Sequence, residues 1–510
     1  MIHSTPGLLG IDVGTTHCKA ALFGLDGSLL RLASRATPVE RTPAGYASID
    51  PQALWQAVAG AIREVAGSGL PGPLVAIGIT SMAETGLLID RATRAVRTPL
   101  IPWFDPAATS QVDRLRATGD PQERFCRAGI RPNFKCSLAK ILWLRERDPQ
   151  VTAGAVWLSA ADYVAFRLAD ALGTDYSLAG RTLAFHLDRR TWDADWLATF
   201  GLEPSLFPEP KPSGNPLGGL LPGVARFLGL PAGTPVAIAG HDHVCAAFAA
   251  GILGPGQAFD SMGTAEALMG AFPSRLLGEA DYQSGLVFGC HLVPGLNYWM
   301  GGLSASGGSV EWLRDILGDT PLSYADLDDL LAQASPGPTG ILYFPYLAGS
   351  GSPHADVRLR GAFVGLDAAH GRAELAKAVL EGTAYEMEFI RRRAEQVFGT
   401  HIDRMAVTGG GARNQAWMQI KADVTGCRLE VPAMPEATLL GAALIAGVGV
   451  GLYAGAAEAL AALGARESAV YEPVADRQAR YQRFYEQGYL ALQPALRAVA
   501  GQIHSMLQHN

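Results

Sequence analysis

The sequence has 510 residues, 48% of them hydrophobic, and a formal net charge of −7 without a basic run. A chain of this length and apolar content can bury more than one core, so we expect two domains. The acidic balance argues against nucleic acid or membrane as a partner. The six cysteines form no CxxC pair, and no apolar run is long enough to span a bilayer, so we expect a cytoplasmic protein.

The first strand-like run is Gly7–Val13, with Asp12 near its end, and it leads into a glycine–threonine turn. Cys18–Phe23 and Ser28–Ser34 follow as further strands of a meander. The tip of the first hairpin is formed by Gly14, Thr15 and Thr16. Backbone N–H groups and hydroxyls at such a tip can hold phosphate oxygens, and an adjacent carboxylate can hold Mg²⁺, often through water. An ordinary Asp-x-Gly hairpin turn is the alternative.

A buried-looking strand, Leu74–Thr80, carries the next candidates beyond its end. Met82 and Glu84 come directly after it, and Trp103 and Asp105 follow a further short segment. In a sheet with helices on its faces, small ligands bind at loops that follow strand ends. We expect Glu84 and Asp105 to accept hydrogen bonds from sugar or polyol hydroxyls, and Trp103 to stack on a carbon face. The alternatives are solvated loop positions for the carboxylates and plain packing for the indole.

His241-Asp242-His243, near the middle of the chain, contains the main catalytic candidate. It follows the apolar run Pro235–Ala239 and Gly240, and it leads into the small-residue helical pattern Val244–Ala250. A strand, a glycine turn and a helix that opens on a carboxylate place Asp242 at the mouth of a cleft. Because a helix N-terminus favours negative charge, this aspartate should stay ionised and accept a proton from an alcohol.

A second glycine–threonine tip indicates an internal duplication. Gly263 and Thr264 join the strand-like runs Gln257–Ser261 and Glu266–Gly270. Two such hairpins facing one another would clamp a polyphosphate from both sides. One hairpin is weak evidence, whereas two hairpins with Asp242 just before the second favour a phosphate site.

A glycine-rich loop follows the strand Met405–Thr408. It comprises Gly409, Gly410 and Gly411, and Asn414 then leads into a helix. Three glycines let a flat adenine ring approach the backbone without meeting a Cβ, and a helix start can face phosphate. This strand–glycines–helix context favours a nucleotide site over a simple flexible turn.

Together these motifs resemble the FGGY family of carbohydrate kinases. Their order covers nearly the whole chain, from Leu8 to about Gly451. The matching segments are Gly10–Thr16, Gly240–Asp242, Ser261–Thr264, Thr408–Gly411 with Asn414, and Gly361–Glu381. The family's lysine–tryptophan signature is matched in part, at Ser137, Lys140 and Trp143.

The resemblance implies an α/β fold of two actin-like (RNase H-like) domains, with mixed sheets flanked by helices and a ligand cleft between them. Residues 1–250 would form a sugar-binding domain and residues 251–510 a nucleotide-binding domain. ATP and Mg²⁺ would be the cofactors, with Asp242 as the catalytic base and Asp12 at the metal. The residues expected to bind the nucleotide are Gly14, Thr15, Thr16, Gly263, Thr264, Gly409, Gly410, Gly411 and Asn414.

The resemblance further implies phosphorylation of a primary hydroxyl, and we expect a ketopentose such as D-xylulose. The expected substrate contacts are Met82, Glu84, Trp103, Asp105, Asp242 and His243. Xylulose kinases resemble this chain in length and motif order, but they have Met-His where this chain has Met82-Ala-Glu84. Glu84-Thr85 looks more like glycerol kinases. A glycerol- or erythritol-type polyol and a gluconate-type sugar acid are therefore alternatives.

Two functions of another class stay open. An actin-like ATPase would share the phosphate hairpins without a small substrate, and a sugar-binding regulator would have lost catalysis. The presence of both Asp12 and Asp242 argues against the second. We expect a small sugar or polyol as the partner, without nucleic acid or membrane, and a homodimer is also open.

Overall fold

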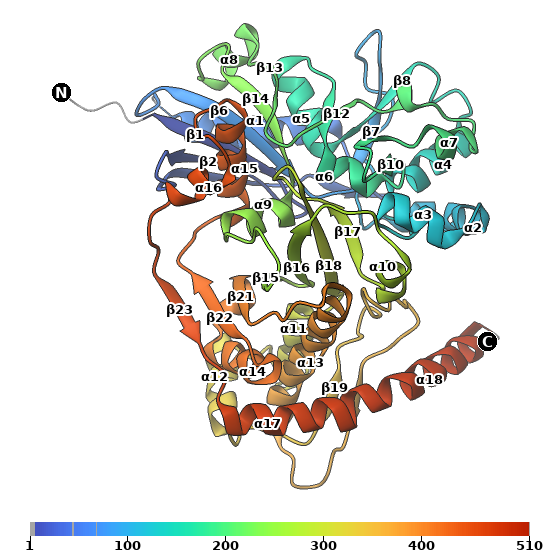
Figure 1. Ribbon diagram of the computed structural model, residues 1–510, viewed down its shortest axis with the longest axis vertical. Helices are drawn as coiled ribbons and strands as arrows, with labels where there is room; N and C mark the ends of the chain where they lie inside the picture. The colour runs from blue at the N-terminus through green and yellow to red at the C-terminus, as the bar shows by residue number, and fades with distance from the viewer. Residues whose placement is uncertain (1–5, 43–44, 68, 509–510) are drawn as a thin grey trace.

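The computed structural model describes residues 6–42, 45–67 and 69–508. Two mixed β-sheets with flanking helices form its upper and lower parts in Figure 1. The first sheet is built from strands that precede residue 242, and the second from strands that follow residue 256. This arrangement confirms the expected two-domain α/β fold. Within the described residues, no helix has the length and apolar character needed to cross a membrane.

The N-terminal sheet has six strands. These are β1 (Gly7–Val13), β2 (His17–Gly24), β3 (Leu29–Ala36), β6 (Leu74–Ser81), β13 (Pro216–Gly219) and β14 (Pro235–His241). They lie in the order β13-β14-β6-β1-β2-β3. β1, β2 and β3 form the predicted antiparallel meander, whereas β6 runs parallel to β1 and β14 parallel to β6.

The C-terminal sheet repeats this plan. Its strands are β15 (Gln257–Met262), β16 (Glu266–Pro273), β17 (Val287–Cys290), β18 (Leu296–Leu303), β21 (Arg404–Gly409), β22 (Arg428–Pro432) and β23 (Ser468–Tyr471). β15, β16 and β18 are antiparallel neighbours, and β21 and β22 run parallel to β15. The order β18-β16-β15-β21-β22 matches β3-β2-β1-β6-β14, which confirms the predicted internal duplication.

Helix α1 (Pro51–Ala66) covers one face of the N-terminal sheet. The Asp50 carboxylate accepts a hydrogen bond from the Ala53 N–H at 2.6 Å, and Pro51 occupies the first turn. Helix α5 (Ala160–Ala169) packs beside it in the same apolar core. The buried face of α1 includes Leu54, Val58, Ile62 and Val65.

The long insertion between β6 and β14 is made of short elements. They are β7 (Gly86–Asp90), η1 (Pro106–Ala108), α2 (Thr109–Ala117), α3 (Pro121–Ala128), α4 (Ser137–Arg147), β8 (Ala155–Ser159), α5, β9 (Gly173–Asp175), α6 (Tyr176–Ala179), η2 (Gly180–Thr182), β10 (Phe185–His186), β11 (Thr191–Trp192), α7 (Ala194–Ala198), η3 (Pro204–Leu206), β12 (Glu209–Lys211), β13 and α8 (Pro222–Leu228). The stretch from Trp192 to Pro216 holds only brief helices and strands.

This insertion packs against the C-terminal sheet. The rings of Phe125 on α3 and Phe288 on β17 meet edge to face with centroids 5.8 Å apart. Arg190 Nη2 donates to Asn297 Oδ1 on β18 at 2.8 Å. One apolar core therefore runs from the insertion into the C-terminal half.

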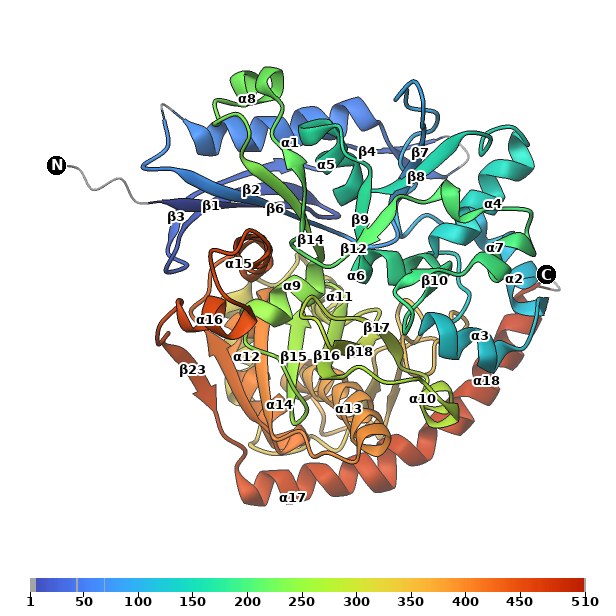
Figure 2. The same cartoon turned by 45° about the horizontal axis from the view of Figure 1, so that its top comes forward.

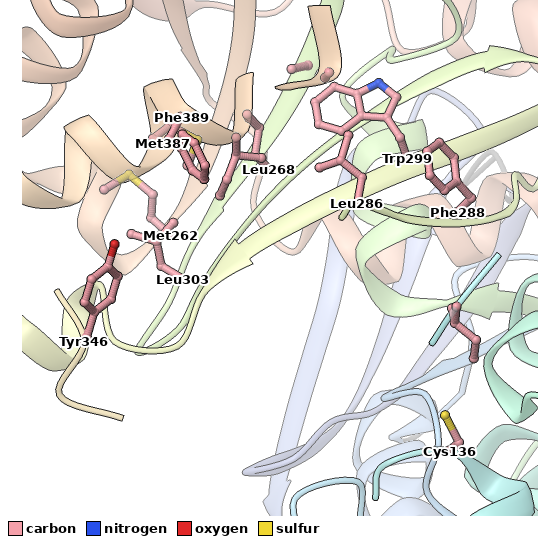
Figure 3. Close-up of a cluster of buried hydrophobic side chains, with 14 of the residues drawn as sticks. Cys136, Met262, Leu268, Leu286, Phe288, Trp299, Leu303, Tyr346, Met387 and Phe389 are labelled. Carbon is pink, nitrogen blue, oxygen red and sulfur yellow. The ribbon is translucent and has the colours of Figure 1, made fainter. Parts of the chain in front are cut away.

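Helix α13 (Arg372–Phe398) supports the C-terminal sheet. In Figure 3, Met262, Leu268 and Leu303 of the sheet lie near Met387 and Phe389 of this helix, within the same buried cluster. The other helices of this half are α10 (Glu279–Ser284), α11 (Gly307–Ile316), α12 (Tyr324–Gln333), α14 (Gln415–Thr425), α16 (Ala456–Ala461), α17 (Ala475–Phe484) and α18 (Leu490–Gln508).

Helix α15 (Ala437–Gly449) lies between strands β22 and β23 of the C-terminal sheet in the sequence, but it packs on the N-terminal sheet (Figure 2). Its backbone comes so close that a Cβ on Gly78 of β6 would lie 2.0 Å from the Ala442 carbonyl oxygen. A Cβ on Gly441 would lie 2.0 Å from the Cys245 carbonyl oxygen in helix α9 (Asp242–Ala249). Glycine at both positions therefore lets α15 contact the helix that begins with Asp242.

Candidate active site

Asp242 is the first residue of α9 and directly follows β14. Its side chain is 25% exposed, and its Oδ1 accepts a hydrogen bond from the His243 backbone N–H at 2.6 Å. His241 Nε2 lies 3.1 Å from the same oxygen. The predicted strand and helix are confirmed, but the predicted glycine turn is wrong: Gly240 lies inside the strand, at a bulge with φ of 135°, and α9 follows His241 directly. A half-buried carboxylate thus stands at a helix N-terminus, oriented by both neighbouring residues.

Asp12 is the second-last residue of strand β1 and lies near Asp242. Burial raises the pKa of Asp12 well above its ordinary value, the charge of Asp242 raises it further, and Lys19 opposes the rise. Its Oδ1 is buried and lacks a hydrogen-bond partner in the described part of the chain. A buried oxygen without a donor, beside a second carboxylate, is a place where a cation would relieve repulsion.

The donor chemistry of this corner fits Mg²⁺. Magnesium is usually bound through one or two carboxylates together with phosphate oxygens and water, and Asp12 and Asp242 offer such carboxylates. Glu436 lies nearby, but both its oxygens accept hydrogen bonds from Lys19 Nζ at 2.9 Å. No group of three or more potential ligands among the described residues is arranged to hold a metal alone. The site therefore suits an ion that arrives with phosphates.

The first hairpin tip comprises Gly14, Thr15 and Thr16, between β1 and β2. Thr15 Oγ1 accepts a hydrogen bond from Trp103 Nε1 at 2.9 Å and donates to Met82 Sδ at 3.6 Å, whereas Thr16 is exposed. The structure thus brings two groups together that are distant in the sequence. Trp103 and Met82 support the hairpin tip through their polar atoms.

The second hairpin tip, Gly263–Ala265, is exposed between β15 and β16. The start of α11 supports it from behind. Gly307 N–H donates to the Gly263 carbonyl at 3.1 Å, and Ser306 and Gly308 N–H groups donate to the Thr264 carbonyl at 3.0 Å. The predicted tip geometry is confirmed, and it is held by backbone contacts to a helix start.

A buried charged network lies at the base of this second hairpin. Lys421 of α14 contacts Asp260 Oδ2 at 2.8 Å and Glu266 Oε1 at 2.5 Å. Ser306 Oγ donates to the other oxygen of Glu266. All three charged side chains are at most 1% exposed. This network joins the hairpin to the helix that follows the glycine-rich loop.

The glycine-rich loop connects β21 with α14, as predicted. Gly409 has φ of 99°, and a Cβ there would lie 2.3 Å from the Met262 carbonyl, so it is needed for packing on β15. Gly410 is exposed with open space around it, whereas Gly411 faces Met262 and Trp417. The loop therefore leaves free space at Gly410.

Asn414 caps α14. Its Oδ1 accepts a hydrogen bond from the Trp417 N–H at 2.8 Å, and its Nδ2 donates to Asp328 Oδ1 at 2.7 Å. Both polar atoms of the Asn414 side chain therefore already form hydrogen bonds at the helix start. The residue lies beside the glycine-rich loop, and its contact with adenosine stays a prediction.

Glu84 lies in a buried ion pair that no local motif indicates. Its Oε1 accepts hydrogen bonds from Nε of Arg181, at 2.9 Å, and from Nη2 of the same guanidinium. The backbone of Glu84 is left-handed, with φ of 59°. Buried Lys140 holds this loop by donating to the carbonyls of Glu84, Ile101 and Pro102 at 2.6, 3.2 and 3.0 Å.

Asp105 is buried, and both its carboxylate oxygens accept backbone hydrogen bonds. The residue is 1% exposed, Oδ1 accepts a hydrogen bond from the Ala107 N–H at 2.8 Å, and Oδ2 accepts one from the Ala47 N–H. Because backbone donors occupy both oxygens, the carboxylate fixes the loop after Trp103. From the sequence we expect a carboxylate that is free to accept hydroxyl hydrogen bonds, whereas in the structure it accepts backbone hydrogen bonds. Local spacing does not show which backbone N–H groups will face a side chain.

Three cationic residues near Glu84 were not proposed as contacts from the sequence. Arg181 pairs with Glu84 over 97 positions, which no local pattern could indicate. Lys135 Nζ lies 4.8 Å from the centre of the Trp103 ring, and burial lowers the pKa of this lysine. Lys140 carries a sequence signal, because it belongs to the partly matched lysine–tryptophan signature, but its three carbonyl contacts are visible only in the fold.

The fold and the site together place this protein in the class of two-domain phosphotransferases. Two copies of one sheet order each carry a glycine–threonine hairpin, and two carboxylates lie close to the first of them. The chain belongs to the FGGY family of carbohydrate kinases. The family's N-terminal domain matches residues 8–249 and its C-terminal domain matches residues 261–450.

Individual relatives differ in the substrate that their names give. The chain is 30% identical to a xylulose kinase of Bacillus subtilis, over 94% of this chain and 95% of the relative. It is 32% identical to a glycerol kinase of Gloeobacter violaceus, over 89% and 90% of the two chains. The crystal structure of xylulose kinase from Rhodospirillum rubrum superposes with a TM-score of 0.86 at 28% identity, covering 96% of this chain and all of that one.

Proposed function

We propose that this carbohydrate kinase transfers the γ-phosphoryl group of ATP to a primary hydroxyl of a ketopentose such as D-xylulose. The observation that carries the proposal is Asp242, a half-buried carboxylate at a helix N-terminus beside Asp12. Similarity to xylulose kinases over almost the whole chain supports the ketopentose.

Asp242 would act as the general base. Within the described chain, its contacts with His241 and His243 both use Oδ1, which leaves Oδ2 to accept the proton of the attacking hydroxyl. His241 and the His243 N–H would hold the carboxylate in one orientation. A base placed in this way supplies roughly 10²–10⁴-fold in rate.

The two hairpin tips would hold the nucleotide. Gly14, Thr15, Thr16, Gly263 and Thr264 would bind phosphate oxygens, and Gly409–Gly411 with Asn414 would lie beside adenosine. Asp12, helped by water, would hold Mg²⁺, which neutralises phosphate charge when bound. Thr15 would remain fixed by Trp103 during this contact, because the indole N–H already binds its hydroxyl.

The sugar would lie between Asp242 and Glu84. Arg181 occupies Glu84 Oε1, so Oε2 is the oxygen that would accept sugar hydroxyls. Met82, Trp103 and His243 would complete the proposed contacts. Asp105 would act only through the loop that it fixes, because backbone N–H groups occupy both its oxygens.

Glycerol is the second candidate substrate, because a glycerol kinase is as similar to this chain as the xylulose kinases are. Erythritol-type polyols and gluconate-type acids complete the set of acceptors to compare. An actin-like ATPase or a silent sugar-binding protein would show no sugar-dependent turnover.

A substrate panel tests the proposal. ADP release is measured with ATP, Mg²⁺ and single ketoses, polyols and aldonates, and we expect the highest kcat/KM with a ketopentose. If activity is highest with glycerol, glycerol replaces the ketopentose as the substrate. ATP hydrolysis that does not depend on any acceptor would contradict the proposed reaction.

A further inference from the structure

Tyr298 comes from the C-terminal sheet but lies against the substrate side of the site. It is on β18 and is 0% exposed, and its hydroxyl is buried without a hydrogen-bond partner among the described residues. Its ring lies over Gly289 of the paired strand β17, where a Cβ would be only 2.4 Å from the ring. Glycine at that position therefore leaves room for the tyrosine to lie across β17.

The first neighbour of Tyr298 is Arg181. Arg181 uses Nε and Nη2 to hold Glu84. Its Nη1 and the Tyr298 hydroxyl are both buried polar atoms without a hydrogen-bond partner in the described chain. Burial raises the pKa of the Tyr298 hydroxyl to about 12, and the Arg181 guanidinium opposes this rise. Tyr298 is therefore a neighbour of the guanidinium that binds Glu84.

The second neighbour is His241. The rings of His241 and Tyr298 have centroids 6.5 Å apart and are tilted by 42°. On its other side, His241 Nε2 lies 3.1 Å from Asp242 Oδ1, while Nδ1 is buried without a partner in the described residues. One tyrosine thus faces both residues that orient the two carboxylates.

We propose that Tyr298 is a positioning residue that couples the placement of Glu84 and Asp242 to the C-terminal sheet. This inference rests on the proposed function, in which Glu84 binds the sugar and Asp242 accepts its proton. Tyr298 acts through Arg181 on the first carboxylate and through His241 on the second. It touches neither reacting atom.

The strand pairing connects this contact to the nucleotide side. Tyr298 pairs with Ala271 of β16, and β16 begins at Glu266, directly after the Gly263–Ala265 tip. A shift of the C-terminal sheet relative to the N-terminal sheet would therefore move the phosphate tip and the tyrosine together.

Two substitutions separate the parts of the tyrosine. Tyr298→Phe keeps the ring beside His241 but removes the hydroxyl beside Arg181, so we expect KM for the sugar to rise by about 3–10-fold with kcat changed less than about twofold. Tyr298→Leu also removes the ring, and kcat should fall by at least about 10-fold. Tyr343→Phe is the matched control, since it removes another buried hydroxyl, bonded to Ser309, from the same half of the protein.

A second readout does not depend on turnover. Crystal structures of wild type and of both Tyr298 variants show whether His241 Nε2 stays 3.1 Å from Asp242 Oδ1 and whether Arg181 Nε stays 2.9 Å from Glu84 Oε1. Because Tyr298→Leu removes the ring that faces His241, we expect the imidazole to move away from Asp242 in this variant and to keep its place in Tyr298→Phe.

The two measurements distinguish the possible failures. If wild type is inactive on every acceptor, the proposed function is wrong, but the crystal structures still show whether Tyr298 holds His241 and Arg181 in place. If the His241–Asp242 and Arg181–Glu84 contacts are the same in wild type and Tyr298→Leu, the inference is overturned. It is also overturned if wild type is active and both Tyr298 variants keep kcat and sugar KM within twofold, as Tyr343→Phe should.

Discussion

Asp12 and Asp242 are two carboxylates in one corner of the molecule, and their environments differ. Asp242 is partly open and accepts a hydrogen bond from a backbone N–H, whereas Asp12 has one buried oxygen, Oδ1, without a hydrogen-bond partner in the described chain. Burial and the charge of Asp242 raise the pKa of Asp12. Between the ordinary carboxyl pKa and this raised value, folding takes up a proton, so the contribution of Asp12 to stability falls as pH rises.

The first prediction follows from that sign. Asp12→Asn removes a carboxylate that is costly to ionise, so without Mg²⁺ the variant should be more stable than wild type toward the upper end of this pH window. With Mg²⁺ and ATP, wild type should gain stability and the Asp12→Asn variant should gain much less. Thermal unfolding from about pH 5 to about pH 8 measures both effects. Equal stabilisation of the two proteins by Mg²⁺ and ATP would contradict the assignment of Asp12 to the metal.

At the scale of elements, the phosphate-side hairpin and helix α14 are joined through one buried lysine. Lys421 contacts Asp260 and Glu266, and all three side chains are essentially inaccessible. Burial and the neighbouring charge of Glu266 raise the pKa of Asp260 to about 7. Two carboxylates therefore depend on one ammonium group for compensation.

The second prediction is the loss of this lysine. Lys421→Met leaves two buried carboxylates without their cation and should lower the free energy of unfolding by about 3–5 kcal/mol. Lys19→Met is the control, because its ion pair with Glu436 is 31% and 22% exposed and should contribute no more than about 1 kcal/mol. Denaturant unfolding of both variants provides the comparison. Equal losses would show that burial does not set the strength of the α14 contact.

At the scale of the whole molecule, α15 joins the two halves. It follows the C-terminal strands β21 and β22, packs on β6 of the N-terminal sheet and contacts α9, whose first residue is Asp242. The close approach depends on glycine at positions 78 and 441. The position of the base is thus set by elements from both ends of the chain.

The third prediction tests this contact. Gly78→Ala places a Cβ 2.0 Å from the Ala442 carbonyl, so α15 must shift, and we expect a loss of about 1–3 kcal/mol together with lower kcat. Gly223→Ala is the control, since that glycine in α8 has open space around its Cβ position and should be neutral or slightly stabilising. Unchanged stability and kcat in Gly78→Ala would show that the close packing does not position α9.

Local patterns predicted the elements and tips well. The strand and helix around Asp242, the hairpins at Gly14–Thr16 and Gly263–Thr264, and the glycine-rich loop all depend on short-range chemistry. The turn expected at Gly240 is instead part of strand β14. The duplication followed because the two hairpins share one pattern.

Contacts between distant segments were not predictable in the same way. Arg181 meets Glu84 across 97 positions, Asp105 is bound by the N–H of Ala47, and Tyr298 reaches His241 from the other sheet. Each depends on how elements pack, which the residues alone do not indicate. The roles of the site residues and the identity of the sugar stay predictions for experiment.

The most direct test is the turnover of Asp242→Asn with the best sugar, measured as ADP release and paired with nucleotide affinity from calorimetry. The amide keeps the size of the side chain but cannot accept the proton, so kcat should fall by roughly 10²–10⁴-fold while ATP affinity stays close to that of wild type. Turnover near the wild-type rate would contradict the central claim that this carboxylate is the base.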